Sequence, residues 1–77
     1  MFTCTISDLG LTYKSDKIAD ILKRLDEYIC ENYGKYYTIL NNESGASYEK
    51  IEYVIKPGDY LVLTSRFDSI NFVIKEI

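Results

Sequence analysis

The chain has 77 residues, of which 47% are hydrophobic, a formal net charge of −3, and neither histidine nor tryptophan. This composition excludes a disordered chain of low hydrophobicity, and it disfavours non-specific nucleic-acid binding, which depends on clustered cations. At this length we expect one domain spanning residues 1–77, which buries only about 60% of the surface that the unfolded chain exposes.

Two cysteines are too few for a secreted scaffold held together by disulfides. The first ten residues, MFTCTISDLG, lack the charged and apolar regions of a secretion signal. No apolar run approaches the roughly 20 residues that a membrane span needs. We therefore expect a cytoplasmic protein with free thiols that does not bind membranes.

The first predicted element is a strand over residues 1–6, with Phe2, Cys4 and Ile6 on one face. Residues 7–14 are predicted to be a connector. A helix over 15–33 follows, with Ser15 as its N-cap and with Gly34 in the left-handed conformation that ends many helices.

The predicted helix has two contrasting faces. One arc, about 120° wide on a helical wheel, is apolar and consists of Ile18, Ile21, Leu22, Leu25, Tyr28 and Ile29. An arc of about 60° on the opposite side carries four carboxylates, from Asp16, Asp20, Glu27 and Glu31. A line of carboxylates fits a positively charged groove made for nucleic acid, but Lys17, Lys23 and Arg24 border it, as on an ordinary solvated helix face.

After the helix the apolar period changes to two, which predicts strands over 36–40, 48–56, 60–66 and 70–75. Residues 41–45 form a polar loop, and residues 68–69 form a turn. The run Lys56-Pro57-Gly58-Asp59 predicts a type II turn with Gly58 at positive φ. Short connections favour antiparallel pairing. The predicted fold class is therefore α+β, with two layers and one amphipathic helix on one face of an antiparallel sheet of about five strands (order β-α-β-β-β-β). The pattern does not place the first strand within the sheet.

One helix covers only one sheet face, so the residues of the predicted strands fall into a helix side and an outer face. We predict that the helix side carries Ile51, Tyr53, Ile55, Leu61, Leu63, Ile70, Phe72 and Ile74. The outer face then carries an apolar centre formed by Tyr48, Val54, Tyr60, Val62 and Val73. Such a mixed face indicates an interaction surface, although scattered apolar surface residues also need no special role.

The residues that carry most catalytic chemistry are scarce. A nucleophile needs a positioned base, and the chain has no histidine. Cys4 is expected to be a small core residue, and carboxylates near Cys30 are expected to raise its pKa and lower its reactivity. The chain has no CxxC pair and no phosphate-binding glycine motif. We expect neither an enzyme nor a cofactor or metal site.

The sequence therefore predicts a small protein-binding module, an inhibitor or adaptor that occludes a partner surface. Its partner is a protein with a basic nucleic-acid-binding groove, or a second copy of the chain through the outer sheet face. In being short, acidic, tyrosine-rich and without catalytic residues, the chain resembles small phage-encoded inhibitors such as anti-CRISPR and antirestriction proteins. This resemblance implies a host cytoplasm but assigns no residues.

The alternative is a single-stranded nucleic-acid binder that uses the tyrosines of the outer face. The predicted partner-binding residues are Asp16, Asp20, Glu27, Glu31, Tyr48, Val54, Tyr60, Val62 and Val73.

Overall fold

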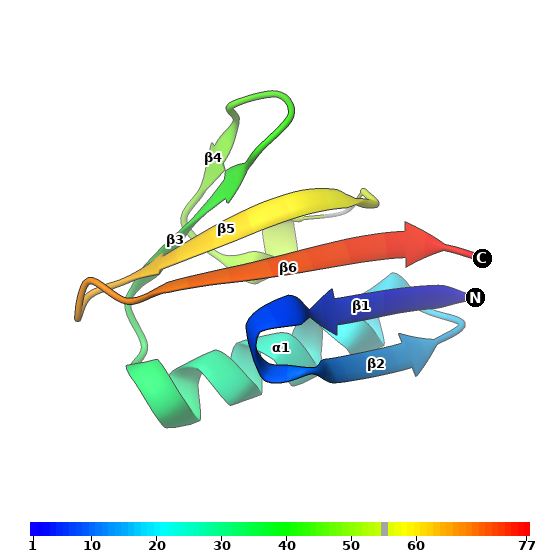
Figure 1. The fold of residues 1–77 in the computed structure, drawn as a ribbon, viewed down its shortest axis with the longest axis horizontal. Coiled ribbons are helices and arrows are strands. Elements are labelled where there is room, and N and C mark those ends of the chain that lie inside the picture. Colours follow the sequence, from blue (N-terminus) through cyan, green and yellow to red (C-terminus); the bar gives the residue numbers. More distant parts are fainter. Residues whose placement is uncertain (55) are drawn as a thin grey trace.

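The computed structural model describes residues 1–54 and 56–77, and within them one α-helix packs on a six-stranded antiparallel sheet (Figure 1). The predicted α+β class is confirmed, with one strand more than expected. The elements are β1 (Phe2–Ile6), η1 (Ser7–Leu9), β2 (Leu11–Ser15), α1 (Ile18–Tyr33), β3 (Tyr37–Asn41), β4 (Ser47–Tyr48), η2 (Ile51–Tyr53), β5 (Gly58–Thr64) and β6 (Ser69–Glu76), where η marks a 3₁₀ helix.

The additional strand, β2, lies where a connector was predicted. Gly10 has a φ of 65°, which glycine adopts without strain, and this conformation reverses the chain directly after η1. β2 then pairs with β1 from Ile6↔Leu11 to Phe2↔Ser15. Because Ser15 belongs to this strand, the helix begins at Ile18 and not at Ser15. Ser15 still supports the helix start, since its Oγ accepts from the Lys17 N–H (3.2 Å) and donates to Asp20 Oδ2 (3.2 Å).

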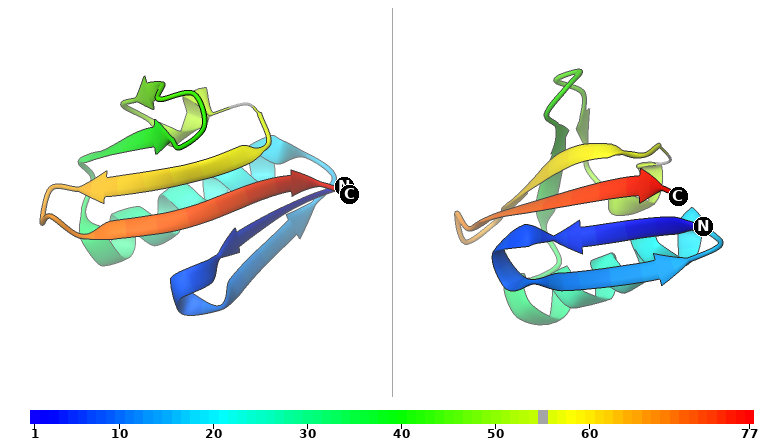
Figure 2. Two further views of the ribbon diagram at one scale, coloured as in Figure 1. Left: turned by 45° about the horizontal axis from the view of Figure 1, so that its top comes forward. Right: turned by 45° about the vertical axis from the view of Figure 1, so that its right-hand side comes forward.

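The strand order is β2-β1-β6-β5-β3-β4, so the first strand lies between β2 and the last strand. Figure 2 shows from two further sides that α1 lies along one side of this sheet, which we call the inner face. We call the opposite side the open face.

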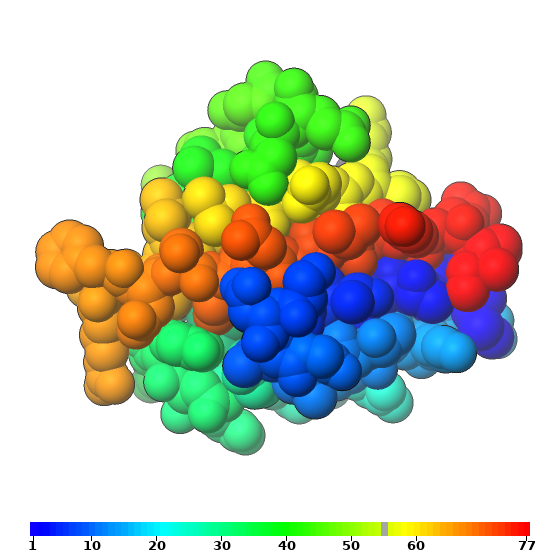
Figure 3. Space-filling model, in the orientation of Figure 1, coloured from blue at the N-terminus to red at the C-terminus, as the bar shows by residue number. Residues whose placement is uncertain are grey.

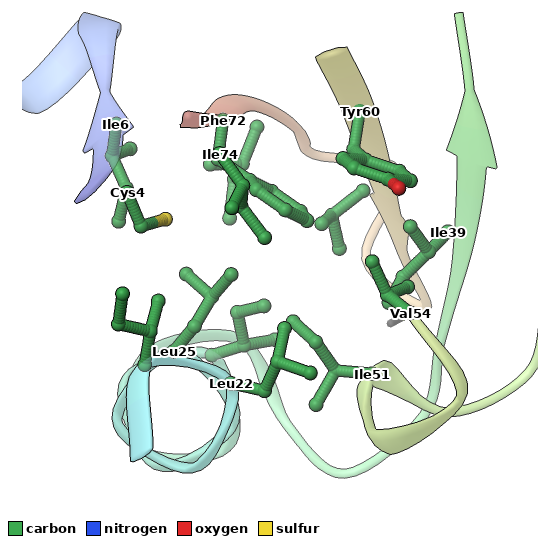
Figure 4. Close-up of a cluster of buried hydrophobic side chains, with 14 residues drawn as sticks. Cys4, Ile6, Leu22, Leu25, Ile39, Ile51, Val54, Tyr60, Phe72 and Ile74 are labelled. Carbon is green, nitrogen blue, oxygen red and sulfur yellow. The ribbon is translucent and has the colours of Figure 1, made fainter. Parts of the chain in front are cut away.

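The apolar side of α1 is the side that the sequence predicted. Ile21, Leu22, Leu25 and Ile29 are buried, with Ile18 and Tyr28 partly buried beside them. In Figure 4, Leu22 and Leu25 point towards Phe72 and Ile74 of the sheet. Gly34 follows the helix with positive φ (99°) but an extended ψ (174°), so it does not adopt the predicted left-handed helical conformation.

The predicted strand over 48–56 is wrong for most of its length. β4 ends at Tyr48, and the chain then forms η2, in which Ile51 is buried, followed by Val54, which is also buried. A spacing of three brings Ile51 and Val54 to the same side of a tight helical turn, whereas a strand would separate them. η2 lies beside α1, so helix and turn together cover the inner face (Figure 4). Ile55, predicted to face the helix, lies outside the described residues.

Two predicted turns also differ from the structure. Gly58 does not have positive φ and instead begins β5, where an added Cβ would lie 3.3 Å from Tyr60 Cε2. This glycine therefore makes room for the Tyr60 ring. The turn placed at Asp68 and Ser69 lies earlier, because β5 ends at Thr64 and β6 already begins at Ser69.

Candidate interaction surfaces

Most residues predicted to form the outer face lie in the core. Val54, Tyr60 and Val62 are no more than 1% exposed, and Tyr48 is half-buried against the core. Of the predicted set, only Val73 lies on the open face. The outer-face prediction is therefore wrong for Tyr48, Val54, Tyr60 and Val62. The last three are buried and cannot contact a partner in the folded protein.

The error comes from the phase of β5. In the sheet, Tyr60 is paired with Phe72 and Val62 with Ile70, so these four side chains share the inner face. The Tyr60 and Phe72 rings stack with centroids 5.1 Å apart. The sequence held one signal for this phase: Asp59 is charged, and sending it to the open face sends Tyr60 inward.

The open face carries a different apolar group. Alternation along the paired strands places Leu40 of β3, Leu61 and Leu63 of β5 and Val73 of β6 on it, flanked by threonines of β1 and β3. Leu63 is 40% exposed, and the other three are partly exposed. We call Leu40, Leu61, Leu63 and Val73 the open-face patch.

The loop between β5 and β6 carries the most exposed large hydrophobic side chain of the described residues, Phe67, at 97% exposure. The Phe67 N–H donates to the Thr64 carbonyl (3.1 Å), and the Thr64 N–H donates to the Asp68 carbonyl (3.0 Å). Phe67 has a φ of +64°, the left-handed conformation that usually selects glycine at the end of such a three-residue hairpin loop. Figure 3 shows this hairpin end projecting at the left of the molecule. Sequence reasoning missed Phe67; the available signal was a hairpin loop without glycine or asparagine.

A second exposed aromatic residue lies beside this loop. The Ser65 N–H donates to the Tyr36 carbonyl (3.1 Å), which continues the β3–β5 pairing by one residue and gives Tyr36 the same face as Leu63. Tyr36 is 79% exposed, and the neighbouring cations Lys35 and Arg66 are exposed as well. We call Lys35, Tyr36, Arg66 and Phe67 the hairpin tip.

The four predicted carboxylates do not form one helical line. Asp20, Glu27 and Glu31 are exposed on α1, but Asp16 is exposed in the bend between β2 and the helix. Lys23 and Arg24 lie with Asp20 and Glu27 around the same shallow surface depression. The charge on this side of α1 is therefore mixed.

A groove of about 620 Å³ lies between α1, the start of β3 and the segment from Glu49 to Glu52. Inside it, the Tyr37 hydroxyl donates to Asp26 Oδ1 (2.5 Å) and accepts from the Ile51 N–H (3.3 Å). The Cys30 thiol donates to the same Asp26 oxygen (3.7 Å). This network ties β3 and η2 to the helix.

The Tyr37 hydroxyl and the Cys30 thiol of this groove are held in their neutral forms. Burial first, and then the hydrogen bond to Asp26, raises the pKa of Tyr37. Burial and the Asp26 carboxylate also raise the pKa of Cys30, as the sequence predicted. In the core, burial raises the pKa of the Cys4 thiol to about 12. Thiols with raised pKa values are poor nucleophiles at neutral pH.

Among the described residues, no group of three or more cysteine and carboxylate side chains gathers as a metal-ligand set. No helix in the described part of the chain is long and apolar enough to cross a membrane. Comparison with protein-family models, curated proteins and solved structures gives no match. Candidate function therefore rests on the surfaces of this molecule alone.

Proposed function

We propose that this protein is a non-enzymatic binding module that acts by occupying the surface of a protein partner, as an inhibitor or adaptor. The observation that carries this proposal is Phe67, an aromatic side chain that is both fully exposed and in a left-handed backbone conformation.

Neither property of Phe67 benefits the folded chain by itself. A left-handed conformation costs a non-glycine residue about 1–2 kcal/mol, and 97% exposure leaves its ring no contacts that offset this cost. Strained residues concentrate at functional sites, and aromatic residues are enriched among those that dominate protein–protein binding. A ring inserted into an apolar pocket of a partner would supply the missing contacts.

The surroundings of Phe67 extend the same surface. Tyr36 lies beside the loop, and Leu63 connects it to the open-face patch. An aromatic anchor next to a partly exposed apolar sheet face has the composition of an interface core, with the cations Lys35 and Arg66 at its rim. We propose the hairpin tip and the open-face patch as one partner-binding surface.

Phe67→Asn tests this proposal, because asparagine tolerates the left-handed conformation and removes the ring. We expect the free energy of unfolding of the variant to be unchanged or higher by up to about 1 kcal/mol. On an affinity column, we expect the immobilised variant not to retain the host proteins that the immobilised wild type retains. The matched control is Tyr53→Asn, which removes a 58% exposed aromatic residue from η2. Equal retention of the same proteins by wild type and Phe67→Asn would refute the proposal.

The exposed carboxylates of α1 provide a second arm of this experiment. Asp20→Lys with Glu27→Lys reverses charge on the helix side proposed for a partner with a basic groove. If these changes abolish retention while Phe67→Asn does not, the working surface is the helix and not the hairpin tip.

A single-stranded nucleic-acid binder is the second candidate, and the hairpin tip gives it a new basis. Tyr60 is buried and cannot stack on a base, but Phe67 and Tyr36 are exposed rings with Lys35 and Arg66 beside them. Rings with adjacent cations are the usual single-strand platform. Retention on an oligonucleotide column that weakens steeply with salt and is lost in Phe67→Asn would favour this candidate; no retention would remove it.

A further inference from the structure

The two edges of the sheet are protected unequally. At one edge, β4 has only two residues, and the chain leaves the sheet directly into η2. At the other edge, β2 has five residues, all paired with β1 on one side. No strand from the described part of the chain lies on its other side (Figure 2). Alternate N–H and C=O groups of β2 therefore point away from the sheet, where a further strand can bond to them.

The side chains of β2 do little to prevent such pairing. The strand contains no proline, and Lys14 is its single charged residue. Tyr13 pairs with the buried Cys4, so its side chain lies towards the inner face, where it is partly buried. A residue opposite Tyr13 on an added strand would face the same layer.

That layer is lined by tyrosines of α1. Tyr28 and Tyr33 pack edge to face with ring centroids 6.3 Å apart, and both are partly buried against the core. α1 contacts β2 directly, and burial first, followed by the neighbouring Tyr33 and Tyr13, raises the pKa of Tyr28. Tyr13, Tyr28 and Tyr33 thus form an amphipathic seam directly beside the open edge, of the composition that binding surfaces favour.

We propose that β2 of a second copy of this chain pairs antiparallel with β2, centred on Tyr13, and joins the two sheets across a two-fold axis. This register places Leu11 opposite the copy's Ser15, Thr12 opposite its Lys14 and Tyr13 opposite its Tyr13. It brings no like charges face to face, and it works whichever alternate backbone groups of β2 point outward. Both tyrosine seams meet below the shared strands.

The charges of α1 select a second copy over an unrelated strand. Lys17, which directly precedes α1, and Lys23 and Arg24 are exposed cations beside one exposed carboxylate, whereas the exposed charges of residues 25–33 are the carboxylates of Glu27 and Glu31. Asp26 is bonded to Tyr37 in the groove and is not counted. The two-fold axis sets the two helices antiparallel on the same side of the joined sheet. The basic half of each helix then lies towards the acidic half of the other, which is a self-complementary arrangement.

Three variants at the strand test this interface by analytical ultracentrifugation of the whole chain over a wide concentration range. Thr12→Lys places a lysine opposite Lys14 of the copy at two symmetric contacts, and Thr12→Glu places a carboxylate there. Both change an exposed residue, so their effects on the monomer are matched. We expect Thr12→Lys to raise the dimer Kd about tenfold and Thr12→Glu to lower it. Adding Lys14→Glu to Thr12→Lys again places opposite charges face to face, so it should reverse the loss and lower the Kd as Thr12→Glu does.

Wild-type protein that stays monomeric at the highest concentration would overturn the proposal. So would a dimer that tolerates Thr12→Lys but dissociates with Leu61→Lys, because the copies would then meet through the open-face patch. Phe67→Asn should leave the dimer intact. The proposed dimer interface at β2 and the proposed partner-binding surface at the hairpin tip are therefore tested independently of each other.

Discussion

Strand β5 sends three side chains to the inner face of the sheet and three to its open face, Asp59, Leu61 and Leu63. Tyr60, Val62 and Thr64 point inward and are at most 7% exposed, while Leu63 on the other side is 40% exposed. Leucine is more hydrophobic than threonine, so Leu63 and Thr64 taken alone favour the opposite arrangement, whereas the charge of Asp59 favours the observed one. The neighbouring strand decides, because Phe72 and Ile70 of β6 lie opposite Tyr60 and Val62. The face that a residue takes is a property of the paired sheet.

The largest expected difference in stability between the inner and open faces is measured at two adjacent residues of β5. Val62→Lys inserts a charge at a fully buried position, and we expect a loss of at least about 3 kcal/mol in the free energy of unfolding, or no folding at all. Leu61→Lys places the same charge on the open face and should change stability by less than about 0.5 kcal/mol. Urea unfolding followed by circular dichroism measures both. Equal effects would mean that the two faces are not distinguished as described.

A smaller change in stability is expected where α1 and η2, which cover the inner face, are joined by hydrogen bonds. Tyr37→Phe removes the hydrogen bonds that join Asp26 of α1 and Ile51 of η2 through one hydroxyl. We expect a loss of about 1–3 kcal/mol, because the Asp26 carboxylate and the Ile51 N–H lose a partner in a partly buried site. The control is Tyr36→Phe, the preceding residue, which is 79% exposed and should change nothing measurable. A neutral Tyr37→Phe would show that η2 stays in place without the hydroxyl.

Alkaline pH should act on the core through Cys4. Burial raises the pKa of Cys4 from 9.0 to about 12, so the folded state keeps this proton after the unfolded state has lost it. The stability that Cys4 contributes is therefore complete below about pH 9 and declines as the pH rises towards 12, by at most about 1.4 kcal/mol per pH unit for one group.

Urea unfolding at a series of pH values should show this decline, and Cys4→Ala should make it shallower. Tyr37 and Tyr60, whose pKa values burial also raises, would contribute the remaining slope. A slope unchanged by Cys4→Ala would contradict the assignment to Cys4.

The smallest expected effect on stability lies on the open face. Leu63→Thr keeps a residue suited to a strand and removes apolar surface from the open-face patch. We expect less than about 0.5 kcal/mol of change in the free energy of unfolding, together with weaker retention of the partner captured by the wild type. A large loss of stability would place Leu63 in the core, against its 40% exposure.

The sequence predicted the buried face of an element most reliably where the opposite side of that element is strongly polar. The apolar face of α1 and the inward phase of β6 are correct because charged or amide residues alternate with the apolar ones, as Asn71 and Lys75 do in β6. The fold class followed from these elements and the short connections. Strand β5 has less contrast, since apolar residues occupy both phases and Asp59 is its single charged residue, and its pairing with β6 resolves the two phases.

Two further features could not be derived because local and tertiary signals differ. In β2, the sequence LTYKS has no clear period, and the strand exists because Gly10 returns it to β1. The stretch 48–54 alternates like a strand, but burying Ile51 and Val54 beside α1 requires a helical turn. The strained conformation of Phe67 could not be predicted for a related reason, since the hairpin around it sets its backbone conformation.

The pairing of β1 with β6 also governs how the chain can be made and rearranged. Residues 1 and 77 lie side by side, joined by the Ile77 N–H to the Met1 carbonyl (2.8 Å), whereas the hairpin tip lies at the other end of β6 (Figure 1). Nascent chains that lack β6 leave β1 and β5 without the strand that separates them, so the sheet can assemble only after residues 69–76 have emerged from the ribosome. A circular permutant that links residue 77 to residue 1 and opens the loop between β3 and β4 would make β6 an internal strand and allow it to fold earlier during synthesis.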